Sequence, residues 1–270
     1  MRRSTAFLVN TPDIELWPAA LCRARANADA RVISFSETVL RRKRDGRFLA
    51  AVGRRGLRPL LPDLTREPGL EAAIDALAVL DARVRDAAAV ARGALRADDV
   101  HADNAAMGLP GDYAETSGLP FHAEPRLLAF AGRDRYRRAL WLLAPAARAW
   151  RAMREAAARD GVRLEAISGY RSHAYQRGIF ERKFARGLTL AEVLRVNAAP
   201  GHSEHHSGRA LDIGTPGEPP AEESFEATPA YAWLCEHAGD FGFALSYRRD
   251  NPHGIVFEPW HWCWHAPDAR

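Results

Sequence analysis

The sequence has few lysines, few cysteines and no long apolar run. Lys43 and Lys183 are the only two lysines, so arginine supplies almost all of the positive charge. The three cysteines are odd in number, and no pair has the spacing of a metal knuckle or a redox motif, which argues against a disulfide scaffold. Apolar stretches such as 139–147 are too short to span a bilayer. No transmembrane segment is expected.

The composition is that of an ordinary globular protein. The 270 residues are 47% hydrophobic and 9% aromatic, which excludes a disordered or collagen-like chain. The net charge is +4, and a basic run at 41–44 is followed by Arg54, Arg55 and Arg58. This run has no interleaved aromatic residues for base stacking, so it predicts a solvated face and no nucleic-acid partner.

The beginning of the chain does not have the pattern of a secretory signal. The apolar run at 6–9 is interrupted at Asn10 and Pro12, too early for a signal-peptide core. The sequence therefore predicts a cytoplasmic protein, unless another route exports it.

The first half of the chain predicts a separate region. Residues 1–68 mix short apolar runs with Pro and Gly, which is typical of strands and turns. Residues 70–98 are rich in Ala with apolar residues at helical spacing, and 101–125 predicts a long loop or linker. We therefore divide the chain into an N-terminal region of unknown role, 1–125, and a second domain, 126–270. The strands expected in the first region are 32–40, 47–53 and 57–64.

The second half predicts an α+β domain, in which helices cover an antiparallel sheet. Helical periodicity and capping residues predict the helices, and alternating apolar residues predict the strands. The expected helices are 134–159, bent or restarted at Pro145, 173–186, 189–196 and 229–240. The expected strands are 162–168, 208–213, 243–247, 254–258 and 261–264.

Three segments beside these strands contain unusual polar residues: 168–176, 200–214 and 257–262. In the second, six residues separate His205 from Asp212. In the third, Glu258 and His261 lie three apart. Two imidazoles and one carboxylate are a ligand set for catalytic zinc, and Glu258 would then be the general base.

Spacing alone leaves an alternative open. Ten histidines in 270 residues produce some clusters by chance. The turn at 202–206 could lie on the surface, and His261 could be a core histidine beside tryptophans. Arg171 could cap the helix that begins near His173 or pair with a nearby carboxylate.

Three motifs together carry a resemblance to a known family. Residues 203–212 fit the pattern S-x-H-x-x-G-x-A-x-D, Ser168–Ser172 read SGYRS, and Glu258–His261 read EPWH. Over roughly residues 130–265 the chain resembles the VanY-like zinc D-Ala-D-Ala carboxypeptidases, which belong to the LAS group of metallopeptidases. The resemblance implies the Hedgehog/DD-peptidase-like fold, an antiparallel sheet that carries a zinc site and is covered by helices.

The resemblance also implies roles for individual residues. It implies one zinc ion per chain, held by His205, Asp212 and His261. Glu258 matches the catalytic base, and Arg171 matches the arginine that holds the substrate or the developing oxyanion. Gln176 and Ser203 match polar positions of the substrate cleft. His202 and His206 match no ligand position and are expected to support the ligands or face solvent. Four other histidines are expected to be surface or structural residues: His173, His237, His253 and His265. Cys263 is expected to be a half-buried thiol.

The implied activity is hydrolysis of a peptide bond in peptidoglycan-type peptides, with removal of a C-terminal D-alanine. Two alternatives remain. One is an endopeptidase that cuts within the stem peptide, and the other is a zinc-binding module without catalysis. Glu258 beside Arg171 favours an enzyme, because a module without activity has no need of the base.

Overall fold

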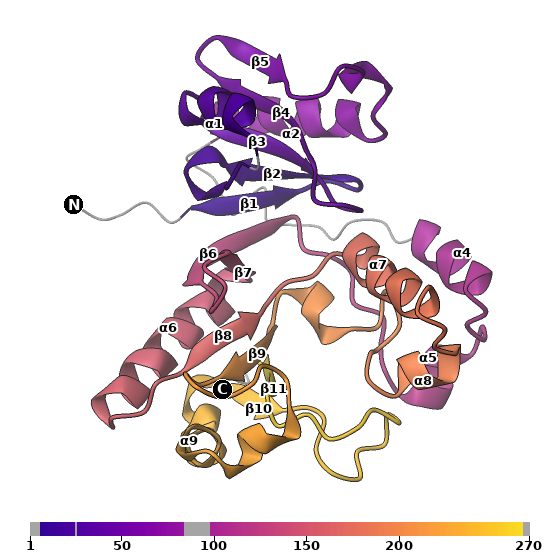
Figure 1. The fold of residues 1–270 in the computed structure, drawn as a ribbon, viewed down its shortest axis with the longest axis vertical. Coiled ribbons are helices and arrows are strands. Elements are labelled where there is room, and N and C mark those ends of the chain that lie inside the picture. Colours follow the sequence, from indigo (N-terminus) through magenta and orange to yellow (C-terminus); the bar gives the residue numbers. More distant parts are fainter. Residues whose placement is uncertain (1–5, 25, 84–97, 267–270) are drawn as a thin grey trace. The chain divides into compact units, whose positions relative to one another are not determined.

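The computed structural model describes three stretches of the chain, residues 6–24, 26–83 and 98–266 (Figure 1). They form two compact units. The N-terminal unit is Met1–Arg96 with Glu124–Phe130, and the C-terminal unit is Ala97–Ala123 with Ala131–Arg270. Among the helices of the described stretches, none combines the length and the apolar character needed to cross a membrane.

The N-terminal unit is built on an antiparallel sheet with strands in the order β5-β4-β3-β2-β1-β6. One face buries Ile14, Leu16 and Leu49 against Ala73 of α2, because alternate residues of a strand point to the same side. The elements are β1 (Phe7–Asn10), β2 (Ile14–Pro18), α1 (Asn27–Ser34), β3 (Thr38–Arg42), β4 (Phe48–Gly53), β5 (Gly56–Pro59), α2 (Leu70–Arg83) and β6 (Leu127–Arg133).

The chain returns to this unit at 124–130. Lys43 Nζ forms a buried ion pair of 2.5 Å with Glu124 Oε2, and Asn10 Nδ2 donates to the carbonyl of Pro125 at 2.8 Å. The start of β6 then pairs with β1, with Leu8 opposite Leu128.

The predictions for the N-terminal region are partly confirmed. Strand β4 fills 48–53 as predicted, and β5 covers only 57–59 of the strand predicted at 57–64. In the strand predicted at 32–40, residues 32–34 end helix α1 and only 38–40 belong to a strand. The helix buries Ile33 in a cluster with Ala19, Val39 and Ala51, so tertiary packing accounts for the helix at 32–34. The predicted helix at 70–98 begins as expected at Leu70. Its part at 84–97 lies outside the described residues.

The C-terminal unit has the predicted α+β class. Its sheet is antiparallel in the order β10-β11-β9-β8. Helix α6 buries Ala146, Trp150, Met153 and Ala157, a spacing that places all four on one face. The elements are α4 (Asp98–Ala106), α5 (Tyr113–Ser117), β7 (Ala139–Leu142), α6 (Ala144–Arg159), β8 (Glu165–Ser168), α7 (His173–Phe184), α8 (Leu190–Leu194), β9 (Ala210–Gly214), α9 (Pro229–His237), β10 (Phe243–Leu245) and β11 (His261–Trp264).

Two elements of this unit correct the prediction. The helix expected at 134–159 begins at Ala144, where Pro145 had predicted a restart, and Ala139–Leu142 before it form a strand instead. Pro145 explains the boundary, because proline is tolerated in the first helical turn and not within a helix. The strand expected at 254–258 is absent: these residues are irregular in the structure.

Residues 98–123 are not the long loop or linker predicted at 101–125. They contain helices α4 and α5, and Leu109, Tyr113 and Leu119 are buried in a cluster with Phe180 of α7 and Val193 of α8. These apolar side chains explain why the segment packs with the C-terminal unit. The division between the units therefore differs from the predicted boundary at residue 125.

Candidate metal centre

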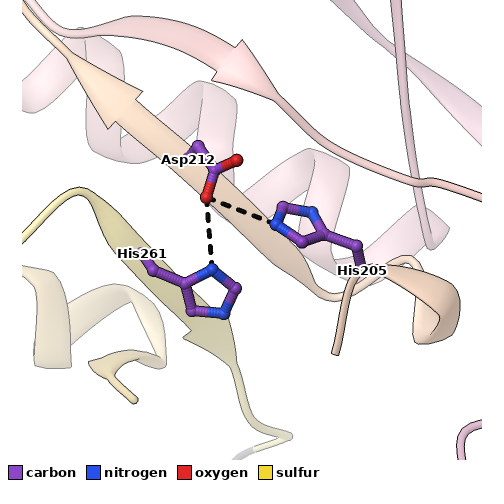
Figure 2. A group of neighbouring side chains, drawn as sticks. All are labelled: His205, Asp212 and His261. Atoms are coloured by element: carbon purple, nitrogen blue, oxygen red, sulfur yellow. Dashed lines mark hydrogen bonds and ion pairs between the residues drawn. The ribbon is translucent and has the colours of Figure 1, made fainter. Parts of the chain in front are cut away.

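Two strands and one turn bring together His205, Asp212 and His261. Strand β11 pairs antiparallel with β9, and its register places His261 directly opposite Asp212. Directly opposed residues project on the same face of a sheet. His205 comes from the 3-10 helix Glu204–Ser207, and Gly208 turns the chain into β9 with a φ of 68°. All three side chains are buried, and one ligand atom of each lies within 4.8 Å of the others (Figure 2).

The ring of His205 has a defined orientation. Its Nδ1 lies 2.7 Å from the carbonyl oxygen of Gly169, which can only accept, so Nδ1 carries the proton. Nε2 is then a free lone pair, and it lies 3.3 Å from Asp212 Oδ1. Burial and the nearby charge of Arg171 lower the pKa of His205 to about 4, so the ring is neutral near pH 7.

The carboxylate of Asp212 divides its two oxygens between different partners. Oδ2 accepts from Arg171 Nη2 at 2.5 Å, whereas Oδ1 faces both imidazoles. Burial opposes the charged form, but His205 and Arg171 outweigh this effect and hold the pKa of Asp212 well below its usual range. Asp212 is therefore an anion that presents one oxygen to the centre.

Both nitrogens of His261 face acidic groups. Nδ1 lies 3.2 Å from Asp212 Oδ1, and Nε2 lies 2.8 Å from Glu204 Oε2. Burial opposes protonation, but the hydrogen bonds to Asp212 and Glu204 outweigh it and raise the pKa to about 10. A cation at the centre would take the place of this proton, as in metal sites generally. The donor set therefore fits a divalent metal.

Glu258 lies beside the three residues without joining them. Its Oε2 is 3.9 Å from His261 Nδ1, and its backbone N–H donates to the Tyr247 carbonyl at 3.0 Å. Burial raises the pKa of Glu258 to about 7, against the opposing effect of His261. A carboxylate with a pKa near neutrality can both take up and release a proton.

Among the described residues, the guanidinium of Arg171 has two side-chain partners. Nε donates to Ser168 Oγ at 2.9 Å, and Nη2 donates to the carboxylate of Asp212. Arg171 therefore pairs with a nearby carboxylate, which was one of its alternative roles. It does not cap helix α7, because the Ser172 side chain does so. The guanidinium nevertheless lines the same cleft as the three buried residues.

All seven residues singled out from the sequence line one cleft of about 380 Å³. Gln176 is buried: its Nε2 donates to the Ala198 carbonyl at 2.9 Å, while its Oε1 has no partner among the described residues. Ser203 is also buried and stands just before the 3-10 helix. The other residues at the cleft include Asn197, Glu222, Glu223, Tyr247, Phe257 and Trp260.

Two residues beside His261 were not among the predicted site residues. Glu204 lies between Ser203 and His205, and the ring centre of Tyr247 is 4.7 Å from that of His261. Burial would raise the pKa of Glu204, but the hydrogen bond to His261 and the charge of that ring outweigh it and lower the pKa to about 2. A carboxylate adjoining a histidine of the motif was a usable signal for Glu204.

The neighbouring histidines are structural. His202, His206 and His173 are buried, so none of them faces solvent. His206 Nδ1 lies 2.7 Å from the Arg171 carbonyl, and His202 Nδ1 lies 2.9 Å from the Leu119 carbonyl. These contacts hold the loop of the motif in place. Cys263 is fully buried rather than half-buried, and its thiol has a pKa raised by burial.

Comparison with known proteins points to one family. Residues 140–267 match the family described as VanY, D-alanyl-D-alanine carboxypeptidase. YodJ of Bacillus subtilis (strain 168) is 36% identical over 121 residues, which are 43% of this chain and 43% of YodJ. A D-alanyl-D-alanine carboxypeptidase of Enterococcus faecalis is 35% identical over 118 residues, 40% of this chain and 42% of the relative.

A solved structure shows the same similarity. It is a vancomycin resistance D,D-pentapeptidase VanY from a VanB-type cassette in complex with Zn(II), 30% identical, with 46% of this chain and 73% of that chain covered and a TM-score of 0.39. The present chain spans less than half the length of YodJ and of the Enterococcus faecalis relative.

Proposed function

Because residues 140–267 belong to the VanY family, we propose that this chain is a zinc-dependent peptidase that removes a C-terminal D-alanine from peptidoglycan-type peptides. The observation that carries the proposal is the buried set His205, Asp212 and His261 with Glu258 beside it in one cleft.

The donor set favours zinc among divalent metals. Two imidazole nitrogens and one carboxylate oxygen are a three-ligand set of catalytic zinc sites, which keep a fourth position for water or substrate. His205 Nε2, Asp212 Oδ1 and His261 Nδ1 would hold one ion per chain. When bound, zinc lowers the pKa of a coordinated water and polarises a carbonyl.

Glu258 is proposed as the general base and acid. Its buried carboxylate accepts a proton from the attacking water and delivers it to the nitrogen of the leaving alanine. Its pKa of about 7 suits both transfers. It is not proposed as a ligand, because the centre already has its three donors.

Arg171, Gln176 and Ser203 are proposed to hold the substrate. Arg171 uses Nε and Nη2 on protein oxygens, and the remainder of its guanidinium faces the cleft, where it can donate to a substrate carboxylate or to the developing oxyanion. The unpaired Oε1 of Gln176 is an acceptor for a peptide N–H of the substrate. Ser203 offers a hydroxyl to the terminal carboxylate.

The test uses the purified protein with defined peptides that end in D-Ala-D-Ala, and product masses as readout. We expect loss of a single alanine, no cleavage of a matched peptide ending in L-Ala, and zinc near one ion per chain that is lost in a His205→Ala, His261→Ala double variant. Cleavage within the stem would identify an endopeptidase instead. Zinc retained by the double variant, or no hydrolysis by the zinc-loaded protein, would refute the proposal.

The peptide form that is cleaved also bears on where the protein acts. Activity on intact wall would require a position outside the cytoplasm, whereas activity restricted to small soluble peptides would be compatible with the cytoplasm.

A further inference from the structure

Glu204 contacts one of the proposed metal ligands from outside the ligand set. Its Oε2 lies 2.8 Å from Nε2 of His261, the nitrogen that faces away from Asp212. The Glu204 side chain is 19% exposed, so water competes only weakly for this contact. We propose that Glu204 is a positioning residue that fixes the tautomer and the ring orientation of His261 for metal binding, an inference that rests on the proposed zinc site.

The reason lies in the chemistry of imidazole. A neutral ring carries one proton on either nitrogen, and only the other nitrogen can ligate a metal. A carboxylate accepts hydrogen bonds and cannot donate them, so Glu204 places the proton on Nε2. When a metal takes the place of the proton on Nδ1, which lies 3.2 Å from Asp212 Oδ1, Nδ1 presents its lone pair to the centre. Without Glu204 the ring would distribute between tautomers and orientations, and only some of them could bind.

Glu204 is itself held in place. Ser246 Oγ donates to the same Oε2 at 2.6 Å. The Tyr247 ring lies 4.7 Å from the His261 ring and restricts its rotation. The carboxylate therefore has a defined position before a metal arrives.

The three proposed ligands each have such a partner. The carbonyl of Gly169 orients His205, Arg171 orients Asp212, and Glu204 orients His261. Glu204 is the one anion among these partners, and an anionic acceptor makes an imidazole a stronger donor to a metal. Because Glu204 and His205 are adjacent, one short turn supplies a ligand and the partner of another ligand.

The test compares zinc affinity in the full-length protein and in the Glu204→Ala and Glu204→Gln variants, measured by competition with a chromophoric chelator. We expect Glu204→Ala to weaken zinc binding about 10–100-fold, the usual effect of removing such a partner. Glu204→Gln keeps an acceptor without the charge and should lose less. Ser246→Ala leaves the carboxylate but removes its hydroxyl donor, so it should show a smaller loss of zinc affinity. This variant replaces the Glu204 variants in the test if they do not fold.

Two controls separate positioning from structure. Ser207→Ala disturbs the same turn without touching the Glu204 carboxylate, and it should retain wild-type affinity. The 15N shifts of the His261 ring in the zinc-loaded protein should report a proton on Nε2 in the wild type, and in Glu204→Ala this signal should be lost to solvent exchange.

Wild-type affinity in both Glu204→Ala and Ser246→Ala, or an equal loss in Ser207→Ala, would overturn the inference while leaving the zinc site intact. A wild-type protein that binds no zinc would overturn the proposed function itself.

Discussion

Asp212 on β9 lies directly opposite His261 on β11, with Oδ1 3.2 Å from Nδ1 across the two strands. They lie 49 positions apart in the chain. The pair is defined by strand register, so a shift of one residue would turn one of the two side chains to the other face of the sheet. Several measurable consequences follow from this geometry and from the residues around it.

Replacement of Glu258 should separate catalysis from metal binding. Glu258→Gln keeps the shape but cannot take up a proton, so we expect kcat to fall about 10²–10⁴-fold while zinc stays bound. Glu236→Gln, on the exposed side of α9, is the matched control. A variant that loses zinc would show instead that Glu258 is a ligand.

The wild-type rate should depend on pH through the same group. The base acts when ionised, so kcat/KM is expected to fall as pH drops through its pKa. Burial raises that pKa to about 7, and a cation bound beside it would favour the ionised form and move the fall to lower pH. The acid side of the profile should vanish in Glu258→Gln.

Replacement of Arg171 by Lys tests the shape of the guanidinium. Lysine keeps the charge near Asp212 but cannot also reach Ser168 and the substrate. We expect the variant to fold and bind zinc, with kcat/KM lowered about 10²–10³-fold, the usual effect of losing one oxyanion donor. Near-native turnover, or a large fall in melting temperature with the lost activity, would assign Arg171 a structural role only.

The glycine of the SGYR motif should be intolerant of a side chain. A Cβ on Gly169 would lie 2.7 Å from Leu140 Cδ1 and 3.0 Å from the Trp141 carbonyl oxygen. Gly169→Ala must therefore shift the carbonyl that orients His205, and we expect a loss of about 1–3 kcal/mol in unfolding free energy together with weaker zinc binding. Gly239→Ala, where nothing lies within 4 Å, should change neither. Unaltered zinc affinity in Gly169→Ala would show that the Gly169 carbonyl is dispensable.

Buried His202 should make the metal-free protein sensitive to acid. Burial lowers the pKa of His202, so the unfolded chain binds a proton that the folded chain excludes. The stability from this group is present above the unfolded pKa of about 6.5 and is lost as pH falls below it.

We therefore expect His202→Asn, which preserves the donor to the Leu119 carbonyl, to reduce the fall in melting temperature between pH 7 and pH 5, measured with a chelator present. Each kcal/mol corresponds to about 2–4 °C in a protein of this size. His237→Asn, at a partly exposed histidine of α9, should leave that fall unchanged. An equal fall in His202→Asn and the wild type would show that His202 does not exclude a proton.

The sequence by itself determined the local features of this protein. Apolar spacing predicted most helices and strands of the C-terminal half, because amphipathic periodicity is a property of neighbouring residues. Three short motifs predicted His205, Asp212 and His261 as one ligand set, and Glu258 beside it. The four do lie together, although their roles stay predictions until metal binding and activity are measured.

Only the tertiary structure decided the relationships between distant segments. It packed 97–123 with the C-terminal unit, because Leu109, Tyr113 and Leu119 found a buried partner surface that no local pattern identifies. It also placed the Glu204 carboxylate against Nε2 of His261, across 57 residues of sequence. The spacing of residues along the chain predicts which face of a helix or strand a side chain occupies. Which residue packs against that face depends on strand register and on burial, and these exist only in the folded chain.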